Sequence, residues 1–168
     1  MLLVQMSGFP ASGKSTLSKI IAKEINGIVI DKDILKSSML ENGLDNDVAS
    51  KLAYDMSFDL AKFYMADGRN VVLDSPCYYD EIIERGMAIT KAFSSSYKFL
   101  ECSVESFDII HKRIELRDNM TSQIKSVTKE SFEQAKVHSK KPDQNYLQVD
   151  SSDLSSIDYE FIYEYLRK

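Results

Sequence analysis

The segment from Gly8 to Ser15 constrains this chain more than any other stretch. It reads GFPASGKS, which is the G-x-x-x-x-G-K-[ST] pattern of the phosphate-binding P-loop. Gly8 and Gly13 permit backbone conformations that let successive N–H groups point at one anion, and Lys14 adds a positive charge. An apolar run precedes the loop and a helical pattern follows it, so the sequence predicts a strand, the loop, and a helix whose N-terminus faces the phosphates.

The motif predicts which residues bind ATP and which one contacts its metal ion. We expect the phosphates to be bound by the loop and the first helical turn: Gly8, Pro10, Ala11, Ser12, Gly13, Lys14, Ser15 and Thr16. The Ser15 hydroxyl is a predicted ligand of Mg²⁺. Lys14 is also a predicted catalytic residue, because its charge can stabilise the phosphoryl group during transfer.

The rest of the chain alternates between strand-like and helix-like patterns. Short apolar runs predict strands at residues 1–7, 28–30, 70–73, 97–102 and 146–149. Amphipathic spacing predicts helices at residues 14–26, 33–41, 47–66, 79–93, 105–116, 128–137 and 156–166. This alternation is typical of an α/β fold in which helices cover both faces of a parallel sheet and ligands bind at the carboxyl ends of the strands. We therefore expect one domain over residues 1–168.

The helix predicted at residues 47–66 carries a stripe of large apolar side chains. They recur at helical spacing and comprise Leu52, Met56, Leu60 and Phe63. Because buried helix faces show this spacing, we predict that the stripe packs in the core.

Asp74 is the first of two candidate acidic site residues. It directly follows the apolar strand at residues 70–73, which is the arrangement of a Walker-B carboxylate. Asp74 could hold Mg²⁺ directly or through water, or it could orient the phosphoryl acceptor. The alternative is a capping or turn residue before Pro76.

Asp33 is the second candidate, and it lies just beyond the second predicted strand. A carboxylate near the γ-phosphate could accept the proton of an attacking hydroxyl. The alternative is that Asp33 caps the helix that follows, and Asp31 is a rival for either role. Lys36 lies one helical turn on, so it shares a face with Asp33 and could neutralise phosphate charge.

Arg113 and Arg117 are spaced to project from one helix face, immediately before a polar segment. That segment lacks periodicity, so we expect a loop or mobile lid around residues 113–127. Cations on such a lid would close over the phosphates and stabilise the charge in transit. The alternative is a solvated charged face.

Composition excludes several classes of function. The chain has 21 Lys and Arg against 26 Asp and Glu, a net charge of −5, which disfavours a broad nucleic-acid-binding face. The two cysteines, Cys77 and Cys102, form no C-x-x-C motif, and this favours a reducing cytoplasm. No apolar run approaches the length of a membrane span. We expect a cytoplasmic protein that binds a nucleotide.

The motifs together resemble a known group of enzymes, the small AAA-like P-loop kinases. These include polynucleotide 5′-hydroxyl kinases and the zeta-toxin-type, chloramphenicol phosphotransferase-like and gluconate kinase-like proteins. The resemblance extends from about residue 3 to residue 137, and its motifs are GFPASGKST, Asp33-x-x-Lys36, VVLDS with Asp74, and Arg113-x-x-x-Arg117. This chain departs from the polynucleotide kinases in one respect. Lys36 stands where they have Arg, and Lys cannot make the bidentate contact to a substrate phosphate that Arg makes.

The resemblance implies a P-loop kinase fold with a five-stranded sheet in the order 2-3-1-4-5, a short lid, and ATP and Mg²⁺ as cofactors. It also implies roles for particular residues. Asp33 would be the general base, Lys36 would contact the acceptor, and Asp74 would act in the site. Arg117 would be the lid arginine with Arg113 in support. Residues 140–146 would flank the adenine.

These observations favour an ATP-dependent phosphotransferase that moves the γ-phosphate to a hydroxyl of a small molecule. A 5′-hydroxyl polynucleotide kinase is an alternative that the acidic charge and Lys36 disfavour. A non-catalytic module that binds ATP for regulation, or for binding a partner, is a second alternative. Such a module would tolerate loss of Asp33, whereas a kinase would not.

Overall fold

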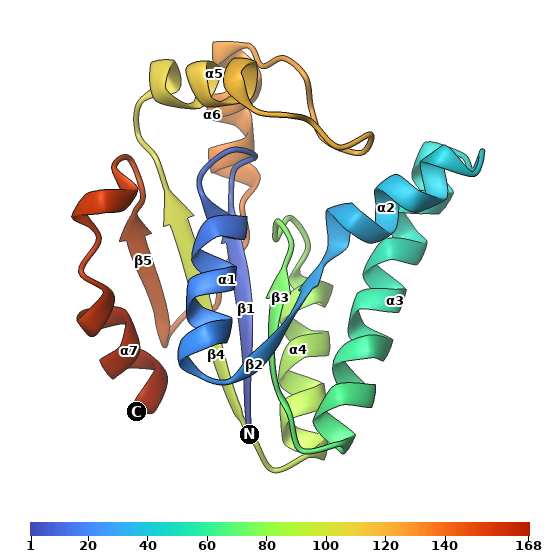
Figure 1. Cartoon of the computed structure of the whole chain (residues 1–168), viewed down its shortest axis with the longest axis vertical. Coiled ribbons are helices and arrows are strands. Elements are labelled where there is room, and N and C mark those ends of the chain that lie inside the picture. The colour runs from blue at the N-terminus through green and yellow to red at the C-terminus, as the bar shows by residue number, and fades with distance from the viewer.

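Five parallel strands form one sheet at the centre of the computed structural model, which describes residues 1–168 (Figure 1). The strands are β1 (Leu2–Gly8), β2 (Gly27–Asp31), β3 (Asn70–Asp74), β4 (Ser96–Ser103) and β5 (Tyr146–Asp150). Their order in the sheet is β2-β3-β1-β4-β5, and every neighbouring pair is parallel. The predicted α/β class and the predicted strand order are therefore both confirmed.

Helices follow the strands in alternation, as the sequence predicts. They are α1 (Lys14–Glu24), α2 (Lys32–Glu41), α3 (Asn46–Ala66), α4 (Asp80–Ala92), α5 (Phe107–Leu116), α6 (Lys129–His138) and α7 (Tyr159–Arg167). The largest difference from prediction is α7, which begins at Tyr159 rather than at residue 156, because a short 3-10 helix (Leu154–Ser156) precedes it. None of these helices combines the length and the apolar content that a membrane crossing requires.

The central strand β1 separates two layers of core. Alternate side chains of a strand point to opposite faces of its sheet. Val4 and Met6 pack with α1 and α7 on one face, whereas Leu3 packs with α3 and α4 on the other. A smaller apolar cluster joins α5, α6 and the P-loop at the carboxyl edge of the sheet, at the top of Figure 1. The P-loop is thus fixed between a helix-covered sheet and a separate cap of two helices.

The predicted buried stripe on α3 is wrong. Leu52, Met56 and Phe63 are 40%, 43% and 67% exposed, and Leu60 is only partly buried. The buried face of α3 is adjacent to the predicted stripe. It consists of four small residues and two large ones: Ala49, Ala53, Ser57, Phe58, Ala61 and Met65. Small side chains let the helix approach its neighbours closely, so a periodic stripe of larger residues on an adjacent face was left outside.

Candidate active site

The P-loop backbone has the conformation that its glycines permit. Gly8 and Gly13 have φ angles of 129° and 100°, in the region that side chains disfavour. A Cβ atom on Gly8 would lie 2.3 Å from the carbonyl oxygen of Cys102, so no larger residue fits there. Gly13 is the N-cap of α1 and no side chain caps the helix, which leaves its first N–H groups to bind an anion.

The Lys14 ammonium lies inside the P-loop. Its Nζ donates hydrogen bonds to the carbonyl oxygens of Gly8 at 2.7 Å and Phe9 at 2.9 Å. Burial lowers the pKa of Lys14, and the nearby charge of Asp74 acts in the opposite direction. An ammonium that donates to the carbonyl oxygens of the loop is well placed to bind the phosphates that the loop motif predicts.

Asp74 ends β3 beside the P-loop and is only 4% exposed. Burial raises its pKa, while the charge of Lys14 and the hydroxyl of Ser15 lower it. Its Oδ2 atom has no hydrogen-bond partner. The predicted alternative of a helix cap is wrong, because α4 begins at Asp80 after Tyr79. Asp74 is instead a buried carboxylate directed at the phosphate-binding loop.

The residues present fit Mg²⁺. A carboxylate oxygen without a partner and the Ser15 hydroxyl are the hard oxygen ligands that this ion prefers. No group of three or more His, Cys, Asp or Glu side chains is arranged to hold a metal alone.

Asp31, not Asp33, caps α2. The Asp31 side chain accepts a hydrogen bond from the backbone N–H of Asp33 at 2.8 Å, so the alternative that Asp33 is the cap is wrong. Burial and the charge of Asp74 raise the pKa of Asp31 to about 6. The Asp33 carboxylate pairs with Lys32 Nζ at 3.0 Å and lines the same cavity as Lys14. The capping arrangement therefore leaves the Asp33 side chain available to a substrate.

Lys32 occupies the place that the sequence reasoning assigned to Lys36. Lys32 is 8% exposed, lines the cavity beside Asp33 and lies over the Tyr54 ring at 5.3 Å. Lys36 does not line the cavity, and burial together with the charge of Lys32 lowers its pKa. No sequence signal distinguishes the two lysines, because both lie within one helical turn of Asp33.

Arg113 and Arg117 make different contacts. Arg113 donates to three backbone carbonyls, at 3.3 Å to Ala11 and at 2.8 Å to both Ser151 and Ser152. It thereby ties the P-loop to the loop after β5. Arg117 donates to the carbonyl of Ile124 at 2.8 Å and lines the cavity. Burial lowers the pKa of Arg117, and the charge of Asp33 opposes this effect. The alternative of a solvated charged face fits neither side chain.

The segment at residues 117–128 has no helix or strand and extends from α5 towards α2 (Figure 1). Ser122 carries the contact with α2. Its Oγ donates to the Asp33 carbonyl at 3.0 Å, its N–H donates to Ser37 Oγ at 3.1 Å, and the two hydroxyls are 2.9 Å apart. Thr121 donates to Glu41 at 2.7 Å. We call this contact the lid latch, and it closes one side of the cavity.

One cavity of about 800 Å³ joins most of the predicted site residues. Its charged lining residues are Lys14, Lys19, Lys32, Arg113 and Arg117, with Asp31, Asp33, Asp74 and Asp118. Gly8 and Ser12 belong to the P-loop but do not line the cavity, and Ser12 is buried. None of residues 140–146, predicted to flank adenine, lines it either. Leu154, which follows β5, does line the cavity, and the sequence did not predict it as a site residue.

The loop, the buried Asp74 and the strand order define a P-loop NTPase fold. The model of the AAA_33 family, described as an AAA domain, matches residues 3–142. The chain therefore belongs to this family. A search of curated protein sequences found no match.

Several solved structures share the fold. A candidate kinase from Chloroflexus aurantiacus is 22% identical, with a TM-score of 0.76, and the match covers 99% of this chain and 93% of that one. Kti12 from Chaetomium thermophilum, solved with ADP-AlF3, is 15% identical with a TM-score of 0.67 and 98% coverage of both chains. A sugar kinase from Janibacter is 13% identical with a TM-score of 0.66, covering 98% of this chain and 94% of its own.

Proposed function

We propose that the protein is an ATP-dependent phosphotransferase that moves the γ-phosphate to a hydroxyl group of a small molecule. One observation carries the proposal. The P-loop lysine, Lys14, and the carboxylate of Asp33 line the same cavity of about 800 Å³, beneath a lid that contacts α2. A cavity that continues past the P-loop to the Asp33 carboxylate has room for an acceptor as well as for the phosphates.

Each charged residue has a distinct role in this proposal. Lys14 binds the phosphates and stabilises the transferring group, and Asp74 with Ser15 would hold Mg²⁺, which neutralises phosphate charge when bound. Asp33 orients the acceptor hydroxyl and takes its proton as the new P–O bond forms, while the bond between the γ-phosphorus and the bridging oxygen breaks and ADP leaves. Arg117 stabilises the charge on the phosphoryl group. The lid was predicted at residues 113–127, but residues 113–116 belong to α5, so the irregular segment from residue 117 keeps water from the reacting atoms.

The known structures support the proposal without naming the acceptor. A sugar kinase is among the proteins that share the fold, and its name describes a hydroxyl-bearing small molecule as acceptor. Kti12 was solved with ADP-AlF3 bound. A 5′-hydroxyl polynucleotide kinase is disfavoured, because Lys36, the cation expected to contact a substrate phosphate, lies outside the cavity. Two free cysteines support a reducing, cytoplasmic setting, and we propose a single domain over residues 1–168.

The test measures ADP release from Mg·ATP across a panel of acceptors: nucleosides, 5′-hydroxyl oligonucleotides, sugars, sugar acids and aminoglycosides. We expect one class to stimulate turnover, and the stimulation to fall by about 10²- to 10⁴-fold in Asp33→Asn, which removes the general base. The matched control is Asp59→Asn, since Asp59 is an exposed aspartate on α3 that pairs only with Lys62.

Two outcomes would contradict the proposal. Stimulation that survives Asp33→Asn would move the role of base to Asp31 or Asp74. Tight ATP binding with no stimulation by any acceptor would favour the non-catalytic module.

A further inference from the structure

A row of polar side chains crosses the sheet on the face opposite α1. Ser7 pairs with Glu101, and Glu101 pairs with Gln148, so the three residues lie side by side on β1, β4 and β5. They share a face because strand side chains alternate with a period of two, and Leu3 and Phe99 on the same two strands pack towards α3 and α4. This row lies behind the P-loop, outside the cavity described above.

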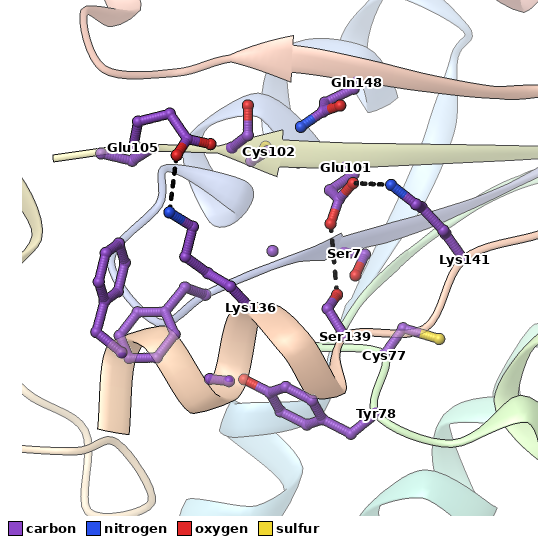
Figure 2. Close-up of a pocket in the computed structure, with 16 residues that line it drawn as sticks. Ser7, Cys77, Tyr78, Glu101, Cys102, Glu105, Lys136, Ser139, Lys141 and Gln148 are labelled. Carbon is purple, nitrogen blue, oxygen red and sulfur yellow. Dashed lines mark hydrogen bonds and ion pairs between the residues drawn. The ribbon is translucent and has the colours of Figure 1, made fainter. Parts of the chain in front are cut away.

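A second cavity of about 160 Å³ lies over this row (Figure 2). Helix α6 covers it with Phe132, Ala135 and Lys136, and Ser139 follows the end of the helix. Other walls come from the P-loop residue Phe9, which packs edge-on against Phe132, from Tyr78 after β3, and from residues 102–105 at and after the end of β4. It shares no lining residue with the larger cavity.

Two buried oxygen atoms of this cavity lack hydrogen-bond partners. Ser7 is fully buried, and its Oγ has none. Glu101 Oε2 also has none, since its nearest cation, Lys141 Nζ, is 3.9 Å away. The other Glu101 oxygen accepts only a long 3.4 Å bond from Ser139, and Figure 2 shows Ser139 directed at Glu101. Because buried polar atoms are nearly always hydrogen bonded to protein or to ordered water, these two atoms indicate that the cavity holds a hydrogen-bond donor, which water or a ligand hydroxyl group can supply.

The charges around the cavity balance. Lys136 pairs with Glu105 at 2.7 Å, and Lys141 lies near Glu101, so two acids face two bases. Neither a cation nor an anion is favoured by such a lining, whereas neutral hydroxyl groups can donate to Glu101 and Ser7. The volume is close to that of an engineered cavity of about 150 Å³ that binds benzene, so about six to eight non-hydrogen atoms fit.

We propose that this cavity binds a small neutral polyol of three or four carbons through Glu101 and Ser7. The cavity is also connected to the P-loop. Gly8 and Phe9 line it, and their carbonyl oxygens accept the hydrogen bonds of Lys14 on the other side of the loop. A bound polyol would therefore contact the same loop that binds the phosphates, and any coupling between the two ligands would be reciprocal.

The test titrates the full chain with glycerol and with erythritol, using calorimetry and ligand-observed NMR. We expect saturable binding with a Kd on the order of millimolar, as suits so few atoms. Glu101→Gln weakens binding about tenfold, because it replaces hydrogen bonds to a charge with neutral ones. Ala135→Leu fills the cavity and abolishes binding while Glu101 remains. Glu115→Gln, on the exposed surface of α5, is the matched control and binds normally. The larger myo-inositol does not compete.

Other outcomes overturn the proposal. Equal affinity in the wild type and in both cavity variants would overturn it. A structure of crystals grown with erythritol that shows only water beside Ser7 and Glu101 would also overturn it. Binding that Asp33→Asn removes and Glu101→Gln leaves intact would place the polyol in the larger cavity. That result would support the proposed phosphotransferase while rejecting this second site.

Discussion

The two halves of the larger cavity are built in different ways. The nucleotide half is one continuous loop, in which the backbone angles of Gly8 and Gly13 place the N–H groups. The acceptor half is assembled from α2, the end of β3 and the lid, and hydrogen bonds between side chains hold it together, such as that between Ser37 and Ser122. The first half is encoded locally and is common to many nucleotide-binding proteins, whereas the second, which we propose binds the acceptor, depends on residues that are distant in the sequence.

Lys14→Met tests the nucleotide half and should have the largest effect. Turnover with the best acceptor should fall about 10³-fold, because a charge that stabilises the transferring phosphoryl group is lost from a buried site. Steady-state ADP release measures this. Lys23→Met, on the last turn of α1, is the control and should keep normal turnover. Retention of most activity in Lys14→Met would mean that the loop does not position the reacting phosphate.

The arginines test where the two halves meet. Arg117→Ala should lower kcat about 100-fold and should reduce stability less than Arg113→Ala does, because its side chain lines the cavity and donates to only one backbone carbonyl, that of Ile124 in an exposed hydrogen bond. Arg113→Ala should instead lower the free energy of unfolding by about 1–3 kcal/mol, because three carbonyls lose their donor. Urea unfolding and kinetics on both variants separate the effects. Equal losses of kcat at unchanged stability would contradict this division of roles.

The lid latch tests the acceptor half alone. Ser122→Ala removes the hydroxyl that contacts Asp33 and Ser37, so the lid should open more often. We expect ATP hydrolysis without acceptor to rise several-fold and the KM for the acceptor to rise, since each neutral hydrogen bond contributes about 1 kcal/mol. Ser126→Ala, in the same loop, is the control. Unchanged hydrolysis in Ser122→Ala would show that the latch does not exclude water.

The smallest effect concerns Asp31, at the border of the two halves. Its pKa of about 6 lies above the value of about 4 in an unfolded chain. Between these values the native state holds a proton that the unfolded chain has released, so stability from this group falls as pH rises. Asp31→Asn keeps the helix cap and removes the titration.

We expect the wild type to lose about 1 kcal/mol relative to Asp31→Asn as the pH rises from about 4 to about 7. This is less than the full pKa difference gives, because the carboxyl is partly exposed. Thermal melts of both proteins at several pH values measure the difference. A stability difference that is independent of pH would contradict the raised pKa.

Local patterns were sufficient to predict the order of the elements and the position of the P-loop. They failed on α3, where Leu52, Met56 and Phe63 have helical spacing and yet face outwards. Periodicity reports that a helix has an apolar stripe, but the partner surface decides which stripe is buried. The same limit applies to Lys32 and Lys36. Lys32 directly precedes Asp33 and Lys36 follows it by three residues, and either lysine could lie beside the Asp33 side chain.

The sequence by itself determined the P-loop, the alternation of strands and helices, and the carboxylates that end β2 and β3. These features depend on backbone angles and side-chain periods within a few residues. Only the tertiary structure decided that Asp31 caps α2, that Arg113 ties the P-loop to the loop after β5, and that Ser122 reaches Ser37. The tertiary structure also decided that a second cavity lies over the polar row of Ser7, Glu101 and Gln148. Such contacts join residues far apart in the chain, so their distances are fixed only when the layers pack.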